Sequence, residues 1–236
     1  MNRRILPGEP PVELTLRRSG QARRYSLRVS RLDGRVTLSL PTWAPEAEAL
    51  AFAAARADWI RRVLGRAAPP ARIVHGGTVP FEGRVLTIEA AAIRAPRIDE
   101  TRLLVPSDPS ALGTRVATFL KFAARQRLHA ATERHAAALG RPFGRITLRD
   151  TRSRWGSCAA DGSLMYSWRL IMAPPEVLDY VAAHEVAHLA RMDHSPAFWA
   201  VVARLMPGYE PQRRWLKRHG TTLHAYDFAA TGDGSD

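Results

Sequence analysis

The chain has 236 residues, of which 35 are Lys or Arg and 22 are Asp or Glu, giving a net charge of +13. The length predicts one or two domains, and an apolar fraction of 46% excludes a wholly disordered chain. A single cysteine excludes a disulfide framework and any metal site built from cysteines alone.

The positive charge favours, at first, a polyanion such as nucleic acid as the partner. Only Lys121 and Lys217 among the basic residues are lysines, and the arginines are spread along the chain rather than gathered in one block. A generally basic, solvated surface therefore explains the charge as well as a binding function does. No signal-peptide core follows the first residues, and no apolar run is long enough to span a membrane, so we expect a cytoplasmic protein.

The first third of the chain is predicted to be rich in strands. Three segments alternate apolar and polar residues, as strands with one buried face do: 12–16, 25–29 and 36–40. Asp33-Gly34 is typical of a hairpin turn between the last two. One helix is expected to begin at Pro45 and to continue to about Arg66, before Pro69-Pro70.

A second group of strands is expected between Ile73 and Val105, and no repeat of 20–50 residues is visible. Apolar residues at three-to-four spacing then predict a long helix from about Pro109 to Leu139, ended by Gly140. The remaining predicted elements are strands at 146–149 and 163–171 and helices at about 174–191 and 196–205.

The motif that carries chemistry is His184-Glu185-Val186-Ala187-His188, an H-E-x-x-H sequence inside the predicted helix at 174–191. Residues four apart on an α-helix differ by only ~40° around the axis, so both imidazoles face one side. They are therefore placed to bind one tetrahedral zinc ion. Glu185 cannot bind that ion in the same way and is placed instead to take a proton from the attacking water.

His194 is the candidate third ligand, because Asp193 interrupts the helical pattern and Ser195-Pro196 is typical of a helix start. A turn just before it would return His194 to the metal, and three histidines leave one position open for water. Asp193 and Glu210 are weaker candidates for the same role. Metzincin proteases share this spacing, but they have a glycine where this chain has Arg191, so a metzincin is disfavoured.

The segments around the motif resemble the YgjP-like family of zinc metallopeptidases (DUF45, M48-type), which is similar in turn to SprT-like zinc proteins. The matching segments are Arg154-Trp155-Gly156-Ser157-Cys158, Trp168-Arg169-Leu170-Ile171, Ala173-Pro174, Leu178-Asp179-Tyr180-Val181, the H-E-x-x-H motif, His194-Ser195, Phe198-Trp199 and Pro207. The resemblance implies an α+β fold with a minigluzincin-like core, in which a small sheet lies beside an active-site helix and supporting helices. It also implies that His184, His188 and His194 bind Zn²⁺ and that Glu185 is the general base.

On this basis we expect three parts in the chain. Residues 1–106 form a β-rich N-terminal region with one helix, residues 107–228 form the catalytic domain, and residues 229–236 form a disordered tail of small and polar residues.

Arginines and a strand beside the motif are candidates for binding substrate. Arg152, Arg154 and Arg169 surround the tight turn at 155–158 and could hold an anionic group; salt bridges to nearby aspartates are the alternative. The strand at 164–168, which contains Tyr166, is expected near the active-site helix. As an edge strand it would pair with an extended peptide, and ordinary sheet pairing is the alternative.

Four further side chains receive weaker predictions. Cys158 is expected to be a packed residue rather than a nucleophile, because the metal site already supplies an activated water. Tyr209, His219 and His224 follow the third histidine and are candidates to stabilise an oxyanion, although each is also explained by a structural role.

Together these features predict a zinc-dependent hydrolase of the metallopeptidase type, acting on a peptide or protein. Two alternatives remain open. The same site could hydrolyse a nucleoside triphosphate clamped by arginines, as a pyrophosphatase or phosphohydrolase does, or the chain could be a basic nucleic-acid-associated protein with a structural zinc. Structural zinc sites are usually closed by four protein ligands, and only three are evident here.

Overall fold

The computed structural model describes residues 2–30, 34–65 and 71–229. Its contacts divide the chain into two compact units, Met1–Pro70 and Ala71–Asp236. The fold is mixed α+β, as predicted, and each unit has its own apolar core. None of the described helices combines the length and the apolarity needed to cross a lipid bilayer.

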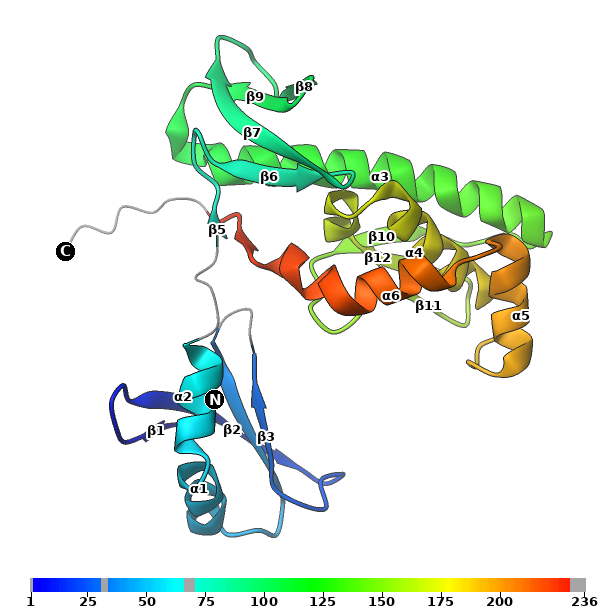
Figure 1. Ribbon diagram of the computed structural model, residues 1–236. Helices are drawn as coiled ribbons and strands as arrows, with labels where there is room; N and C mark the ends of the chain where they lie inside the picture. Colours follow the sequence, from blue (N-terminus) through cyan, green and yellow to red (C-terminus); the bar gives the residue numbers. More distant parts are fainter. Residues whose placement is uncertain (1, 31–33, 66–70, 230–236) are drawn as a thin grey trace. The chain divides into compact units, whose positions relative to one another are not determined.

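The first unit is a four-stranded sheet covered by two short helices (Figure 1). Its strands are β1 (Asn2–Leu6), β2 (Val12–Ser19), β3 (Ser26–Val29) and β4 (Val36–Pro41), in the order β1-β2-β4-β3. The central pair, β2 and β4, is parallel, and both outer pairs are antiparallel. The predicted strands are confirmed; residues 31–33, which include part of the predicted Asp33-Gly34 turn, lie outside the described residues.

Two helices follow this sheet where one was predicted. They are α1 (Glu46–Ala54), which begins after Pro45 as expected, and α2 (Ala57–Leu64). The break falls at Arg56, whose guanidinium lies 3.8 Å from the centre of the Phe52 ring. Because sheets twist, two short helices follow the sheet surface more closely than one straight helix would. Ala49, Ala53 and Ile60 are thereby fully buried against the strands.

The second unit begins with β5 (Ala71–Arg72) and another four-stranded sheet. Its strands are β6 (Thr78–Phe81), β7 (Arg84–Ala91), β8 (Arg97–Asp99) and β9 (Arg102–Pro106), in the order β6-β7-β9-β8. Again the central pair is parallel and the outer pairs are antiparallel. The two sheets therefore share one topology, although no repeat is visible in the sequence.

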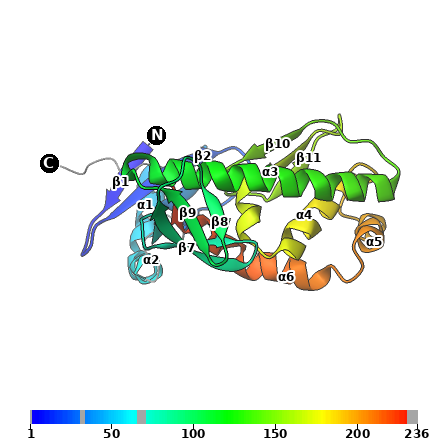
Figure 2. The ribbon, with the colours of Figure 1, turned by 90° about the horizontal axis from the view of Figure 1, so that it is seen from above.

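A long helix connects this sheet to the rest of the unit (Figure 1; Figure 2). After the 3₁₀-helix η1 (Pro109–Ala111), helix α3 runs from Leu112 to Leu139 and ends at Gly140, which has the left-handed φ of 71° that favours glycine. Its first half packs with β9, and its second half packs with the helix that carries the H-E-x-x-H motif.

The remaining elements form the predicted small sheet and its helices. The strands are β10 (Ile146–Arg149), β11 (Gly156–Cys158) and β12 (Leu164–Ser167), followed by the 3₁₀-helix η2 (Trp168–Met172). The helices are α4 (Pro175–Ala187), α5 (Pro196–Leu205) and α6 (Glu210–His219); η3 (Gly220–His224) and β13 (Tyr226–Asp227) end the described chain. Helix α6 was not predicted, and the strand predicted at 163–171 ends at Ser167.

The division between the units lies at residue 70, not at residue 106 as we expected. The reason is that the β6–β9 sheet shares a core with the elements after it. Ile88 and Leu103 of this sheet belong to the same buried cluster as Leu120 of α3 and Val181 of α4. The predicted tail is almost entirely outside the described residues, which end at Ala229.

Candidate metal centre

Helix α4 places two histidines of the motif side by side. Pro174 and Pro175 stand at its start, where a missing backbone N–H costs nothing, and Glu176 complements the positive end of the helix. His184 and His188 lie one turn apart, with ring centroids separated by 5.1 Å. The helix is held by burial on several sides, since nine of its 13 residues are buried.

The third histidine returns to this pair through the predicted turn. After α4, the Asp193 carboxylate accepts a hydrogen bond from the Ser195 backbone N–H at 3.0 Å, and Ser195 caps α5 by accepting from the Phe198 N–H. The Nε2 atoms of His194 and His184 lie 3.2 Å apart, and the ligand atoms of the three histidines all lie within 4.8 Å of one another.

The 3.2 Å separation of the His184 and His194 nitrogens fits a single metal ion. Two nitrogens bound to zinc at ~2.0–2.1 Å in a tetrahedral arrangement lie ~3.3 Å apart. The Nδ1–H of His188 donates to the Arg191 carbonyl at 2.9 Å, which leaves Nε2 of that ring for a metal. Among the described residues, no carboxylate joins the three histidines, so neither Asp193 nor Glu210 belongs to the cluster.

Two of the imidazoles, those of His184 and His188, have lowered pKa values that favour the neutral form, which binds metal. Burial, followed by the neighbouring charges that His188 and His194 would carry, lowers the pKa of His184 to about 3. Burial also lowers the pKa of His188, against the opposing effect of the hydrogen bond to Arg191. Phe198 is fully buried against the centre, with its ring centroid 4.4 Å from that of His188, and contributes to this low-polarity setting.

Glu185 projects from α4 onto β11. Its side chain is buried, with 5% exposed, and it lies so close to Gly156 that a Cβ atom there would be 2.5 Å from Oε1. Burial raises the pKa of Glu185 to about 8, and the nearby charge of Arg154 opposes that rise. The carboxylate can hold this position only while residue 156 is a glycine, because an added Cβ would displace the Glu185 side chain.

The small sheet corrects the prediction about the edge strand. Its order is β10-β12-β11, so the predicted strand at 164–168 is the central strand and cannot pair with a peptide. The edge beside the motif helix is β11, Gly156–Cys158, which pairs with β12 on its inner side and contacts α4. Tyr166 is fully buried in β12, and its hydroxyl lies 3.0 Å from Oγ1 of Thr132. A substrate contact is therefore wrong for Tyr166.

The three predicted arginines lie in different surroundings. Arg169 is buried; its Nε and Nη2 donate to the two carboxylate oxygens of Asp150 at 2.6 and 3.0 Å, and its Nη1 donates to the carbonyls of Leu223 and Tyr226. All three of its nitrogens donate to groups of the fold, so the salt-bridge alternative holds for Arg169 and the substrate-binding prediction is wrong.

Arg152 and Arg154 are exposed. The charge of Arg152 acts on Asp150 and His224, whereas that of Arg154 acts on Glu185. Arg154 is thus the predicted arginine that the structure brings to the catalytic candidate.

The weaker candidates are explained by packing. Cys158 is half-buried, and burial raises the pKa of its thiol to about 11, which does not suit a nucleophile. His224 is buried against Trp155, with ring centroids 5.0 Å apart, and burial lowers its pKa to about 4. His219 packs on Trp215 at the end of α6.

An aromatic stack beside His184 was not predicted. Tyr209, the third oxyanion candidate, is buried between Tyr180 and Trp199, to which it is nearly parallel, with centroids 5.8 and 5.5 Å away. The Arg213 guanidinium lies over Trp199, at one end of this stack, 4.2 Å from the centre of the indole ring. Tyr209 and Arg213 lie four residues apart on either side of Glu210-Pro211, a pair typical of a helix start, and this spacing is the sequence signal that could have revealed the arrangement.

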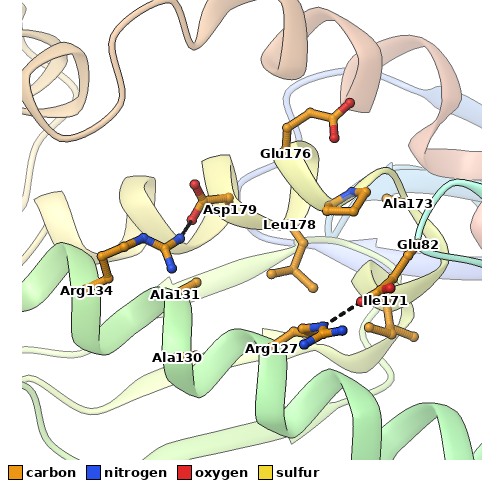
Figure 3. A pocket seen from close by; sticks show the side chains of 11 residues that line it. Glu82, Arg127, Ala130, Ala131, Arg134, Ile171, Ala173, Glu176, Leu178 and Asp179 are labelled. Carbon is orange, nitrogen blue, oxygen red and sulfur yellow. Dashed lines mark hydrogen bonds and ion pairs between the residues drawn. The ribbon is translucent and has the colours of Figure 1, made fainter.

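A separate cavity of about 440 Å³ lies between α3 and the beginning of α4 (Figure 3). Its floor is apolar, and its rim carries two ion pairs, Arg127 with Glu82 and Arg134 with Asp179, each with a 2.6 Å contact. None of the three histidines lines it.

Comparisons with known proteins show the family of the chain. A family model described as the YgjP-like metallopeptidase domain matches residues 23–219. A solved structure similar to part of the chain is the metallopeptidase zymogen abylysin of Pyrococcus abyssi, with a TM-score of 0.36 and 23% identity over 42% of this chain and 97% of abylysin. No curated protein is significantly similar to the chain.

Proposed function

Because the chain belongs to the YgjP-like metallopeptidase family, we propose that it hydrolyses peptide bonds at a zinc ion held by His184, His188 and His194, with Glu185 as the general base. The observation that carries the proposal is the convergence of three imidazoles within 4.8 Å, one residue away from a buried glutamate.

The metal would supply Lewis acidity: when bound, it polarises the peptide carbonyl and lowers the pKa of a water molecule towards ~7. The protein supplies the rest. Glu185, fixed against Gly156, accepts the proton of the attacking water and can return it to the leaving amine. The exposed side of His194 leaves the centre open to substrate, in contrast to the buried face formed by Phe198.

The peptide is proposed to bind as an extra strand on β11. This strand is the edge of the small sheet next to α4, and Gly156 at its start touches the general base. An extended peptide paired to that edge would have its backbone fixed by hydrogen bonds close to Glu185. This replaces the pairing first predicted for the strand at 164–168.

The family match favours a peptide over the nucleoside triphosphate and the nucleic acid that the sequence also allowed. A structural role for zinc is disfavoured as well, because the cluster offers three ligands rather than four.

Metal analysis combined with three variants tests the proposal. Wild-type protein should contain one zinc per chain and cleave members of a peptide library. His184→Ala should lose zinc, whereas His129→Ala, which alters an exposed histidine on α3, should keep both zinc and activity. Glu185→Gln should keep zinc and lose at least about 100-fold in kcat, because the base is not a ligand.

Two outcomes would contradict the assignment. Zinc retained undiminished in His184→Ala would exclude the histidine site, and full peptide cleavage by Glu185→Gln would exclude this glutamate as the base.

A further inference from the structure

Arg213 lies beside the three-histidine cluster, on the wall formed by Trp199. Its guanidinium carbon is 4.2 Å from the centre of the Trp199 ring, whose centroid is in turn 5.5 Å from that of His184 and 6.0 Å from that of His194. One indole ring thus separates the cation from two of the proposed metal ligands.

The first turn of α6 fixes this geometry. The Arg213 backbone N–H donates to the Tyr209 carbonyl at 3.1 Å, so the two residues lie one helical turn apart on the same side. Tyr209 stacks on Trp199 at an interplanar angle of 11°, and Tyr180 stacks on Tyr209 at 6°. The indole is therefore held in place, and the arginine rests on a rigid surface.

The side chain of Arg213 is exposed. Within residues 2–30, 34–65 and 71–229, its guanidinium has no carboxylate partner. In this it differs from Arg134 and Arg169, which pair with Asp179 and Asp150. Stacking on the indole uses only the face of the guanidinium. Its N–H groups lie in the plane of the group, where they remain available to bind both oxygens of a carboxylate.

The charge of Arg213 lies close to the three-histidine cluster, with only the Trp199 indole between its guanidinium and the His184 ring. An anionic group at the edge of Trp199 would therefore feel the field of this charge.

We propose that Arg213, held on Trp199, is a substrate-binding residue that recognises a carboxylate of the peptide close to the scissile bond. The inference rests on the proposed peptidase function and names a preference within it. One indole ring separates the guanidinium from the His184 ring, and consecutive Cα atoms of a peptide are ~3.8 Å apart. The carboxylate that Arg213 binds therefore lies one or two residues from the bond that is cleaved. It belongs either to an Asp or Glu side chain or to the free C-terminus of the peptide.

Matched peptide pairs test this preference. In the first set of pairs, the two peptides differ only by Glu or Gln at one position, and each of the two positions on either side of the cleaved bond is tested in turn. In the second set, the two peptides differ only by a free or an amidated C-terminus. We expect the wild type to cleave one carboxylate-bearing member about tenfold faster in kcat/KM than its neutral partner. The pair that shows the difference identifies the source of the carboxylate.

Two variants with the same loss of charge separate Arg213 from the general basicity of the chain. Arg213→Gln should abolish the preference, and Arg214→Gln, which alters the exposed neighbour, should keep it. Arg213→Lys should retain only part of it, because an ammonium cannot bind a carboxylate in a planar, bidentate way. A preference that survives in Arg213→Gln, or an equal loss in both glutamine variants, would overturn the proposal.

A binding experiment distinguishes this inference from the proposed function. The same peptides are titrated calorimetrically into zinc-loaded Glu185→Gln protein, with and without Arg213→Gln. Tighter binding of the carboxylate peptide that depends on Arg213 supports the subsite even if the wild type cleaves none of the peptides. Equal binding of charged and neutral peptides would overturn the subsite even if the wild type proves to be a peptidase.

Discussion

The β1–β4 sheet and the β6–β9 sheet have the same strand order and the same parallel central pair, but their surroundings differ. The first is covered by two helices of nine and eight residues, and the second is followed by a helix of 28 residues. That length carries α3 past its own sheet to the small sheet, where Thr132 contacts Tyr166 of β12, and to the motif helix, where His135 contacts Asp179.

The difference is also one of core chemistry. Every buried polar or charged side chain among the described residues lies in the second unit: Thr132, His135, Ser167, Arg169, Glu185, His188 and His224. The core of the first unit is apolar throughout its described part. The same sheet topology therefore packs against an apolar core in the first unit. In the second unit it packs against a core that also holds titratable groups.

The largest expected effect comes from adding one methyl group to a glycine in each unit. Gly156→Ala should fold, because the side chain of Glu185 can move aside, but the displaced carboxylate should lower kcat about 100-fold or more. Gly20→Ala in the first unit should change neither activity nor stability, since nothing lies within 4 Å of the added Cβ. Zinc content and kcat of both variants are the measurements. Undiminished activity in Gly156→Ala would mean that catalysis does not depend on the place that the Glu185 carboxylate takes against Gly156.

A second comparison truncates one buried leucine in each sheet. Leu38→Ala and Leu103→Ala both remove a fully buried side chain, and each should lower the free energy of unfolding of its unit by about 2–5 kcal/mol. Hydrogen exchange should quicken in α4 only for Leu103→Ala, because that core is continuous with the motif helix. Equal changes in α4 for both variants would show that the units do not unfold separately.

The smallest expected effect depends on pH. Burial alone would raise the pKa of Asp179, but the hydrogen bond and charge of His135, together with Arg134, hold it below its usual value. The carboxylate therefore stabilises the fold above the pKa of the unfolded chain, and this stability is lost as the pH falls through the folded pKa. Asp179→Asn should cost about 1–3 kcal/mol at pH 7, and the cost should shrink in acid.

Asp58→Asn is the matched control in the first unit, because this carboxylate is almost fully exposed and 3.5 Å from Arg61. Its effect on the unfolding free energy should be below about 1 kcal/mol at every pH. Denaturant unfolding between pH 3 and 7 measures both variants, and a loss in Asp179→Asn that does not depend on pH would refute the linkage.

The features that could be predicted from the sequence are those with local causes. The starts of α4 and α5, the end of α3 at Gly140 and the return of His194 each depend on residues within a few positions of one another. Sheet order could not be predicted, because the parallel pairs join strands that are not consecutive. The sequence therefore left both an edge position and ordinary sheet pairing open for β12, and the second is confirmed. The roles of the arginines could not be predicted either. Arg169 and Arg213 are chemically identical, and only tertiary packing buries the first and exposes the second.

The pairing of β5 with β13 has a consequence for the whole second unit. Ala71 lies opposite Tyr226, and the Ala71 N–H donates to the Ala225 carbonyl at 2.8 Å, so the first strand of this unit is hydrogen-bonded to its last described strand. A unit whose ends meet can be spliced into a loop of an unrelated host protein, or circularly permuted, without spanning a gap. The β5–β13 pairing gives the second unit the close entry and exit points that insertion into a host loop requires.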